Sequence, residues 1–137
     1  FDTGKLVFIP NGIDLAAFER LYNEHGLHDL PLTLKDLITR QKERGAKLIV
    51  YAGGLSSQND LEVVIKAAAL LQSRTRPAIA GAAFLFVGDG AEKAKLMDLT
   101  KRLCLENVYF HPPIPRRLVP SLLKAADYTI LHVRKSP

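Results

Sequence analysis

The stretch Lys47-Leu-Ile-Val-Tyr-Ala-Gly-Gly54 decides the fold of this 137-residue chain. Its apolar, β-branched residues predict a strand, and the two glycines predict a tight turn at the end of that strand. A polar loop follows, and the run from Leu61 to Leu71 has the apolar spacing of a helix. A strand that passes through glycines into a helix presents free backbone N–H groups and a positive helix end, which suit a phosphate. The stretch therefore predicts a nucleotide or phosphosugar site.

The same strand, turn and helix pattern continues to the end of the chain. Strands that alternate with helices, and that are themselves nearly continuous apolar runs, are typical of parallel strands covered on both faces. We therefore expect an α/β fold, a doubly wound parallel sheet of Rossmann-like type. The predicted order is strand 48–52, helix 60–74, strand 84–87, helix 91–104, strand 108–110, helix 116–126 and strand 128–133.

Right-handed crossovers predict the order of these strands within the sheet. Strand 48–52 is expected at the centre, with 84–87 and then 108–110 on one side and 128–133 on the other. The topological switch point then falls beside Gly53, where α/β sheets bind their ligands. The chain stops just after the fourth main strand, which would leave an uncovered edge. We therefore expect a sheet truncated at its C-terminus, or one completed by another segment.

Residues 1–45 are predicted to form an initial segment that precedes the Rossmann-like unit at 46–137. A short strand, Leu6–Ile9, ends at the turn Pro10-Asn11-Gly12. Asp14 is expected to cap a helix that Gly26 ends, and residues 33–44 are expected to form a second helix.

Composition limits the range of possible functions. The 19 Lys and Arg against 14 Asp and Glu give a net charge of +5, and these residues are too dispersed to predict nucleic-acid binding. The single cysteine, Cys104, excludes an internal disulfide and is expected to be a core thiol in a reducing, cytoplasmic setting. The four histidines lack ligand spacing, so no metal site is expected.

Two further loops are expected at the same edge of the sheet as Gly53 and Gly54. Gly88-Asp89-Gly90 follows the second strand, and His111-Pro-Pro-Ile-Pro115 follows the third. The stiff proline loop exposes carbonyl groups that could hold the edge of a base. Simpler interpretations remain open, because Asp89 could serve only as a turn former and helix cap, and His111 only as a loop residue.

Five motifs in this order closely resemble the C-terminal half of group 1 glycosyltransferases, over about residues 5–137. Within that family, the chain resembles the bacterial branch that transfers N-acetyl-fucosamine-type sugars. The motifs are Ile9-Pro-Asn-Gly-Ile-Asp14, Val50-Tyr-Ala-Gly-Gly-Leu-Ser56, Phe86-Val-Gly-Asp-Gly90, Glu106-Asn-Val-Tyr-Phe110 and Ala125-Ala-Asp-Tyr128.

The resemblance implies one half of a GT-B fold, the half that binds the nucleotide-sugar donor, with the N-terminal acceptor domain missing from this chain. It implies a retaining transfer from a nucleoside diphosphate such as UDP to a glycan or lipid-linked acceptor in bacterial surface polysaccharide synthesis, with no cofactor and no essential metal. It implies a cytoplasmic protein, with peripheral contact to the inner face of the membrane. The donor-binding candidates are Gly53, Gly54, Ser56, Ser57, Asn59, Gly88, Asp89, Gly90, His111, Pro113, Ile114, Arg134 and Lys135.

The chain departs from the family pattern at two of these positions. The family usually has an arginine where this chain has Gly54 and a lysine where it has Asn59, and the family's glutamates would lie beyond Pro137. The chain alone is therefore expected to be inactive, and its catalytic residues are not defined. Two alternatives stay open, a non-catalytic α/β nucleotide-binding or interaction module and a sugar-nucleotide epimerase of GT-B architecture.

Overall fold

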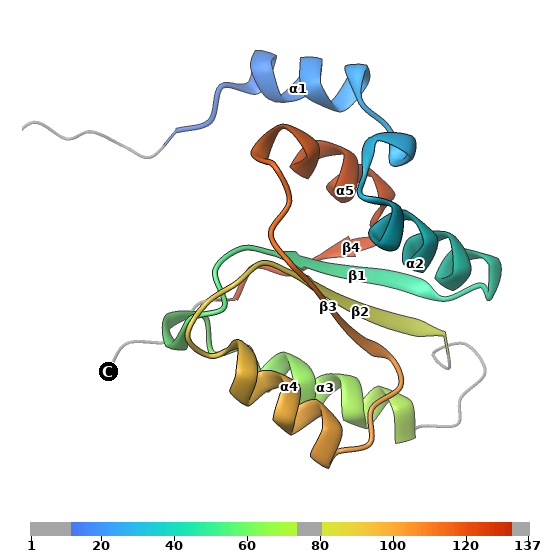
Figure 1. The fold of residues 1–137 in the computed structure, drawn as a ribbon, viewed down its shortest axis with the longest axis vertical. Coiled ribbons are helices and arrows are strands. Elements are labelled where there is room, and N and C mark those ends of the chain that lie inside the picture. Colours follow the sequence, from blue (N-terminus) through green and yellow to red (C-terminus); the bar gives the residue numbers. More distant parts are fainter. Residues whose placement is uncertain (1–11, 74–80, 133–137) are drawn as a thin grey trace, which may run out of the picture.

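The computed structural model describes residues 12–73 and 81–132, and within them four parallel strands form one sheet with the order β3-β2-β1-β4 (Figure 1). β1 lies at the centre and pairs with β2 along its whole length, from Lys47 opposite Ala82 to Ala52 opposite Val87. The predicted α/β class and strand order are confirmed. The strands are β1 (Lys47–Ala52), β2 (Ala82–Val87), β3 (Val108–His111) and β4 (Tyr128–Thr129).

Helices cover both faces of the sheet and form a three-layer arrangement (Figure 1). One face carries α2 (Leu32–Glu43) and α5 (Val119–Ala125), with α1 (Leu15–Glu24) packed against α5. The other face carries α3 (Glu62–Ser73) and α4 (Lys93–Arg102). Three single turns of 3₁₀-helix join these elements: η2 (Leu27–Asp29), η3 (Ser57–Asn59) and η4 (Arg116–Leu118).

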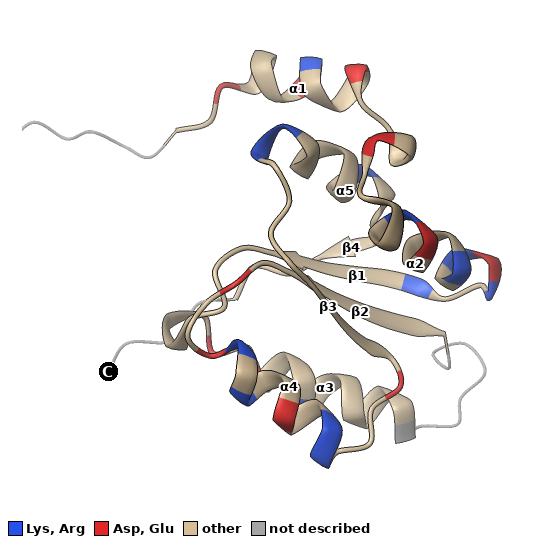
Figure 2. Ribbon diagram, in the orientation of Figure 1, with Lys and Arg blue, Asp and Glu red and all other residues tan. Residues whose placement is uncertain are grey.

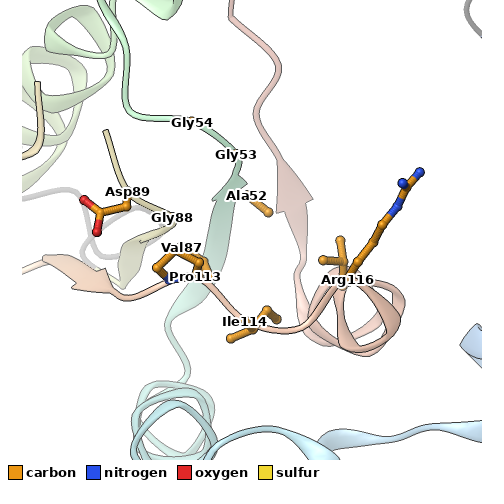
Figure 3. Close-up of a pocket in the computed structure, with 10 residues that line it drawn as sticks. Ala52, Gly53, Gly54, Val87, Gly88, Asp89, Pro113, Ile114 and Arg116 are labelled. Carbon is orange, nitrogen blue, oxygen red and sulfur yellow. The ribbon is translucent and has the colours of Figure 1, made fainter. Parts of the chain in front are cut away.

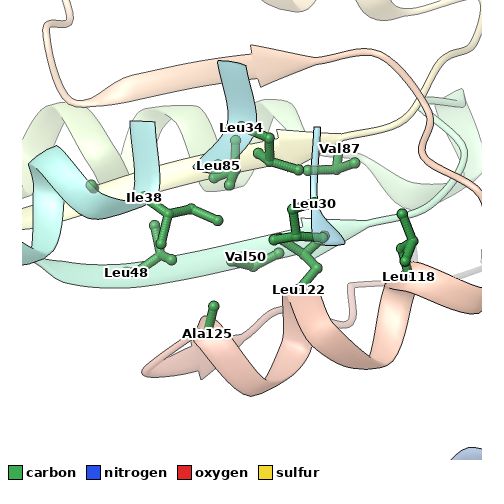
Figure 4. Close-up of a cluster of buried hydrophobic side chains, with 11 residues drawn as sticks. Leu30, Leu34, Ile38, Leu48, Val50, Leu85, Val87, Leu118, Leu122 and Ala125 are labelled. Carbon is green, nitrogen blue, oxygen red and sulfur yellow. The ribbon is translucent and has the colours of Figure 1, made fainter. Parts of the chain in front are cut away.

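Alternation along the strands divides the core into two clusters. Leu48 and Val50 of β1 point to the face under α2 and α5, where they meet Leu34, Ile38 and Leu122 (Figure 4). Tyr51 of β1 and Phe84 and Phe86 of β2 point to the opposite face and pack with Leu61, Ile65 and Leu96 of the α3 and α4 layer. Buried apolar residues on both sides of β1 and β2 explain why these two strands read as continuous hydrophobic runs. In Figure 2, the charged residues accordingly lie on helices and loops, and the strands are uncharged except at Lys47.

Asp127 joins the start of β4 to the start of β1. Its carboxylate accepts hydrogen bonds from Lys47 Nζ at 2.8 Å and from the Leu48 backbone N–H at 2.9 Å. The bond from Lys47 is the main reason that the pKa of Asp127 is lowered, and the pKa of Lys47 is raised by the same pair. The backbone N–H of Asp127 also donates to the Leu48 carbonyl. These bonds set the register of the edge strand β4 relative to β1.

Two sequence predictions for the sheet region are wrong in detail. β4 pairs only through Tyr128 and Thr129, whereas a strand over 128–133 was expected. Leu131 is 92% exposed, so the apolar run after Thr129 is not a buried strand. α3 begins at Glu62, two residues after the predicted start at residue 60, because Asp60 adopts a left-handed conformation with φ of 40°.

Cys104 is exposed, so the prediction of a core thiol is also wrong. The helix ends at Arg102, and Cys104 takes a left-handed conformation with φ of 51°. Its N–H donates to the Lys101 carbonyl, and the N–H of Leu105 donates to the Thr100 carbonyl. This pair of bonds is a Schellman motif, which ends a helix and turns the chain away from the helix axis. The helical periodicity therefore stops before Cys104.

The N-terminal region is described from Gly12 onward. The predicted strand Leu6–Ile9 and most of its turn lie outside the described residues, and the motif around Asn11 does so in part. Asp14 caps α1 as expected, accepting a hydrogen bond from the Ala17 N–H at 2.9 Å. α2 shares a core with β1 and β2. The division of the chain into an initial segment, 1–45, and a Rossmann-like unit, 46–137, stays a prediction.

Candidate functional site

The first glycine turn, Gly53-Gly54, follows β1 and is held by side chains. The Gly54 carbonyl accepts hydrogen bonds from the Tyr51 hydroxyl and from Asn59 Nδ2, each at 2.8 Å. Tyr51 is almost fully buried, and burial raises the pKa of its hydroxyl, so the hydroxyl stays a donor at neutral pH. A Cβ added at Gly54 would meet nothing within 4 Å, so this turn has open space beside it.

The second glycine turn, Gly88-Asp89-Gly90, follows β2 and packs backbone against backbone. A Cβ at Gly88 would overlap the Gly53 carbonyl oxygen, and a Cβ at Gly90 would overlap the Leu55 carbonyl oxygen. The φ values of 156° and 157° are also ones that side chains disfavour. Leu55 N–H donates to the Asp89 carbonyl at 2.9 Å, which joins the two turns. The glycines are therefore needed for the two turns to approach each other.

Both turns line one pocket of about 360 Å³ at the carboxyl edge of the sheet (Figure 3). Most of the wall is apolar, and Asp89 and Arg116 are its only charged residues. In Figure 3 these two lie on opposite sides of the labelled group, and the Arg116 guanidinium extends outward. Within the described ranges, the Gly54 and Asp89 N–H groups have no hydrogen-bond partner. The lining residues are Ala52, Gly53, Gly54, Val87, Gly88, Asp89, Pro113, Ile114, Arg116 and Val119.

Six of the predicted site residues meet in this pocket, and the others lie elsewhere. Ser56 and Ser57 line a separate hollow of about 230 Å³, while Gly90, Asn59 and His111 line neither cavity. Arg134 and Lys135 lie outside the described residues. Arg116, which the sequence also offers as a residue able to meet a phosphate, lines the pocket from the start of η4, directly after the proline loop. The six that meet are Gly53, Gly54, Gly88, Asp89, Pro113 and Ile114.

His111 fixes the proline loop from outside the pocket. Its Nδ1 lies 2.8 Å from the Pro112 carbonyl, and a carbonyl can only accept, so Nδ1 carries the proton. In the neutral ring Nε2 is then an acceptor for the Thr33 hydroxyl, 3.3 Å away at the start of α2. The His111 carbonyl accepts from the Gly88 N–H at 3.1 Å. One residue thus ties the proline loop to α2 and to the second glycine turn.

The hollow beside Ser56 and Ser57 is acidic, because Asp60, Glu62 and Glu92 line it with a single cation, Lys95. Lys95 bridges Glu62 and Glu92 across it. The hydrogen bond from Lys95 lowers the pKa of Glu62, and the same bond raises the pKa of Lys95. The described residues include no group of three or more His, Cys, Asp or Glu side chains placed to hold a metal ion. None of the helices searched within them is long and apolar enough to cross a membrane.

Comparison with known proteins identifies the family of this chain. The family described as "Glycosyl transferases group 1" matches residues 35–135. The chain is also 30% identical over 123 residues to WcaI of Escherichia coli K12, whose name gives it a proposed role as a colanic acid biosynthesis glycosyl transferase. That match covers 90% of this chain and 27% of WcaI.

Solved structures of GT-B glycosyltransferases share the fold. A trehalose-6-phosphate synthase, OtsA, aligns with a TM-score of 0.61 and 15% identity, over 88% of this chain and 29% of its own. Anabaena HepE in complex with UDP-glucose aligns with a TM-score of 0.52 and 19% identity, over 77% of this chain and 29% of its own. The chain thus spans less than a third of each of these relatives.

Proposed function

This chain belongs to the group 1 glycosyltransferases, and on that premise we propose that it forms the donor-binding part of a retaining enzyme that uses a UDP-sugar. The observation that carries this proposal is the pocket at the carboxyl edge of the sheet, where both glycine turns meet the proline loop. Ligands of open α/β sheets bind at this edge, next to the switch point. WcaI and HepE support the choice of a sugar nucleotide, because the name of one refers to glycosyl transfer and the other was solved with UDP-glucose.

In the proposed complex, the diphosphate lies against the first glycine turn. The Gly54 N–H, which has no partner among the residues that the structure describes, is a donor for phosphate oxygens, and Arg116 supplies the positive charge in the described wall. Pro113 and Ile114 form the apolar side of the pocket, where a base can lie. The partly apolar wall strengthens each hydrogen bond to the ligand, because little water competes there.

The proposal extends to the whole protein. We propose transfer to a glycan or lipid-linked acceptor in surface polysaccharide synthesis, in the cytoplasm or at the inner face of the membrane, with the acceptor held by a further domain. No essential metal is proposed, so EDTA should leave UDP affinity unchanged. Retention predicts that product and donor have the same anomeric configuration, which NMR of the product made by the full-length protein would measure.

Titration calorimetry of the chain with UDP tests donor binding directly. Gly54→Arg introduces the arginine usual in the family, and the space at Gly54 accommodates a side chain. We expect UDP affinity to rise about fivefold, equivalent to about 1 kcal/mol for a partly exposed charge-assisted contact. Gly12→Arg is the matched control, because it adds the same charge at a glycine that also has open space and does not line the pocket. Absence of UDP binding in both the unmodified chain and Gly54→Arg would refute the proposal.

A non-catalytic binding module is the second candidate, and the charge of the pocket favours it. Asp89 offsets Arg116 in the lining, and neither Gly54 nor Asn59 provides a cation. An interaction module that takes no nucleotide at this turn would show no rise in UDP affinity in Gly54→Arg. The calorimetric comparison of Gly54→Arg with Gly12→Arg separates the two functions.

A further inference from the structure

The peptide group between Gly54 and Leu55 is fixed at both ends. Its carbonyl accepts from the Tyr51 hydroxyl and from Asn59 Nδ2, and its N–H donates to the Asp89 carbonyl. Because the C=O and N–H of a trans peptide point in opposite directions, these bonds define the orientation of the whole group. They therefore fix the C-terminal side of Gly54. Without such bonds the Gly53-Gly54 pair would have great backbone freedom, because neither residue carries a side chain.

The two side chains that hold this carbonyl are themselves held. Tyr51 is buried against Phe86, with ring centroids 6.1 Å apart. Asn59 gives its other amide hydrogen to Ser56 Oγ at 3.2 Å. The backbone of Asn59 is bound on both sides, since its N–H donates to the Ser56 carbonyl and its carbonyl accepts from His132 Nδ1 at 2.8 Å.

We propose that Tyr51 and Asn59 are positioning residues that pre-organise the Gly54 N–H for the ligand anion. A free Gly-Gly segment would lose conformational entropy when it bound a phosphate, and a turn fixed in advance avoids that cost. Asn59 occupies the position of the family's usual lysine, but both of its amide hydrogens are directed to the turn and it does not line the pocket. At this position the chain therefore supplies order to the turn, where the resemblance implies a charged residue.

The inference rests on the proposed function only where it concerns the ligand, so it is tested with and without nucleotide. The variants are Tyr51→Phe, Asn59→Ala and the double variant. Because either donor alone can hold the carbonyl, each single variant should weaken UDP binding about twofold. The double variant should lose about fivefold more than the product of the single losses, as expected for groups that share a partner. Titration calorimetry measures all four affinities.

Amide hydrogen exchange in the nucleotide-free chain gives the second readout. The Leu55 N–H, on the same peptide group, should exchange faster in the double variant than in either single variant. Gln72→Ala is the matched control, because the Gln72 amide also ties a loop through the Cys104 carbonyl and the Glu106 N–H, away from the pocket. It should lower the melting temperature and leave both UDP affinity and Leu55 exchange unchanged.

The possible failures can be told apart. The positioning role would be overturned if the double variant lost only as much UDP affinity as the product of the two single losses. It would also be overturned if the Leu55 N–H exchanged no faster in the double variant. A chain that binds no UDP but still shows faster exchange in the double variant would refute the proposed function and retain Tyr51 and Asn59 as the residues that fix the turn. Direct contact of Asn59 with the ligand would instead reduce affinity in Asn59→Ala with no change in exchange.

Discussion

The turn at Gly53-Gly54 and the turn at Gly88-Asp89-Gly90 follow neighbouring parallel strands and line the same pocket, but different contacts hold them. Side chains hold the first, through the Tyr51 hydroxyl and the Asn59 amide on the Gly54 carbonyl. Backbone packing holds the second, where Gly88 and Gly90 lie against the carbonyls of Gly53 and Leu55. Similar glycine motifs can thus have different requirements: the second turn requires glycine for space, and Gly54 has room for a side chain.

Gly88→Ala should have the largest effect, because its Cβ would overlap backbone that cannot rotate away. Together with the φ of 156°, this overlap should reduce the free energy of unfolding by about 3 kcal/mol or more. Urea denaturation followed by circular dichroism measures the change. A loss below about 1 kcal/mol would mean that the two turns can separate without cost, and the comparison would fail.

Gly90→Ala should be the next most harmful substitution. Its Cβ would overlap the Leu55 carbonyl, but less deeply than the Cβ at Gly88 overlaps its neighbour. We expect a loss of about 2 kcal/mol, measured by the same denaturation. If Gly90→Ala proved more damaging than Gly88→Ala, the depth of overlap would not be the controlling quantity.

Tyr51→Phe tests the side-chain support of the first turn and should cost about 1 kcal/mol, since Asn59 still satisfies the Gly54 carbonyl. The substitution should also change the response to alkaline pH. Burial raises the folded-state pKa of Tyr51, so its contribution is fully present below the unfolded pKa of about 10 and is lost as pH rises through the folded pKa. Thermal unfolding from pH 8 to 11 should therefore show a smaller alkaline loss for Tyr51→Phe than for the unmodified chain.

Gly54→Ala should have the smallest effect. The added methyl meets nothing within 4 Å, and alanine restricts the unfolded chain, so stability should stay within about 0.5 kcal/mol of the unmodified chain or rise slightly. Calorimetric melting measures this difference. A loss as large as that of Gly90→Ala would show that both turns require glycine, and it would remove the contrast between them.

Local patterns in the sequence were enough to predict β1, β2 and β3, the order of the four strands and the edge at which the loops meet. Strand 48–52 and the glycines that follow it show the reason, because periodicity and turn chemistry act over a few residues. The exposure of Cys104 was not predictable in this way, since a non-glycine residue in a left-handed helix end carries little sequence signal.

The unpredicted parts of the site depend on contacts between distant residues. His111 bonds to Thr33 across 78 positions, and His132 reaches Asn59 across 73. The need for glycine at position 88 arises from the carbonyl of Gly53, which only the paired strands bring close. A motif could therefore identify Asn59 as a site position, but only the folded chain shows its amide directed to the Gly54 carbonyl.

The bond between Asp127 and the start of β1 has a consequence for biosynthesis. Leu48 and Asp127 are 79 residues apart, so one edge of β1 has no partner until the ribosome has added those residues. At ordinary translation rates this takes about 4 to 16 seconds. Over that interval the exposed β1 edge is a template for strands of other nascent chains. Slower translation between β1 and β4 should therefore increase aggregation of newly made protein, even though the finished domain is unchanged.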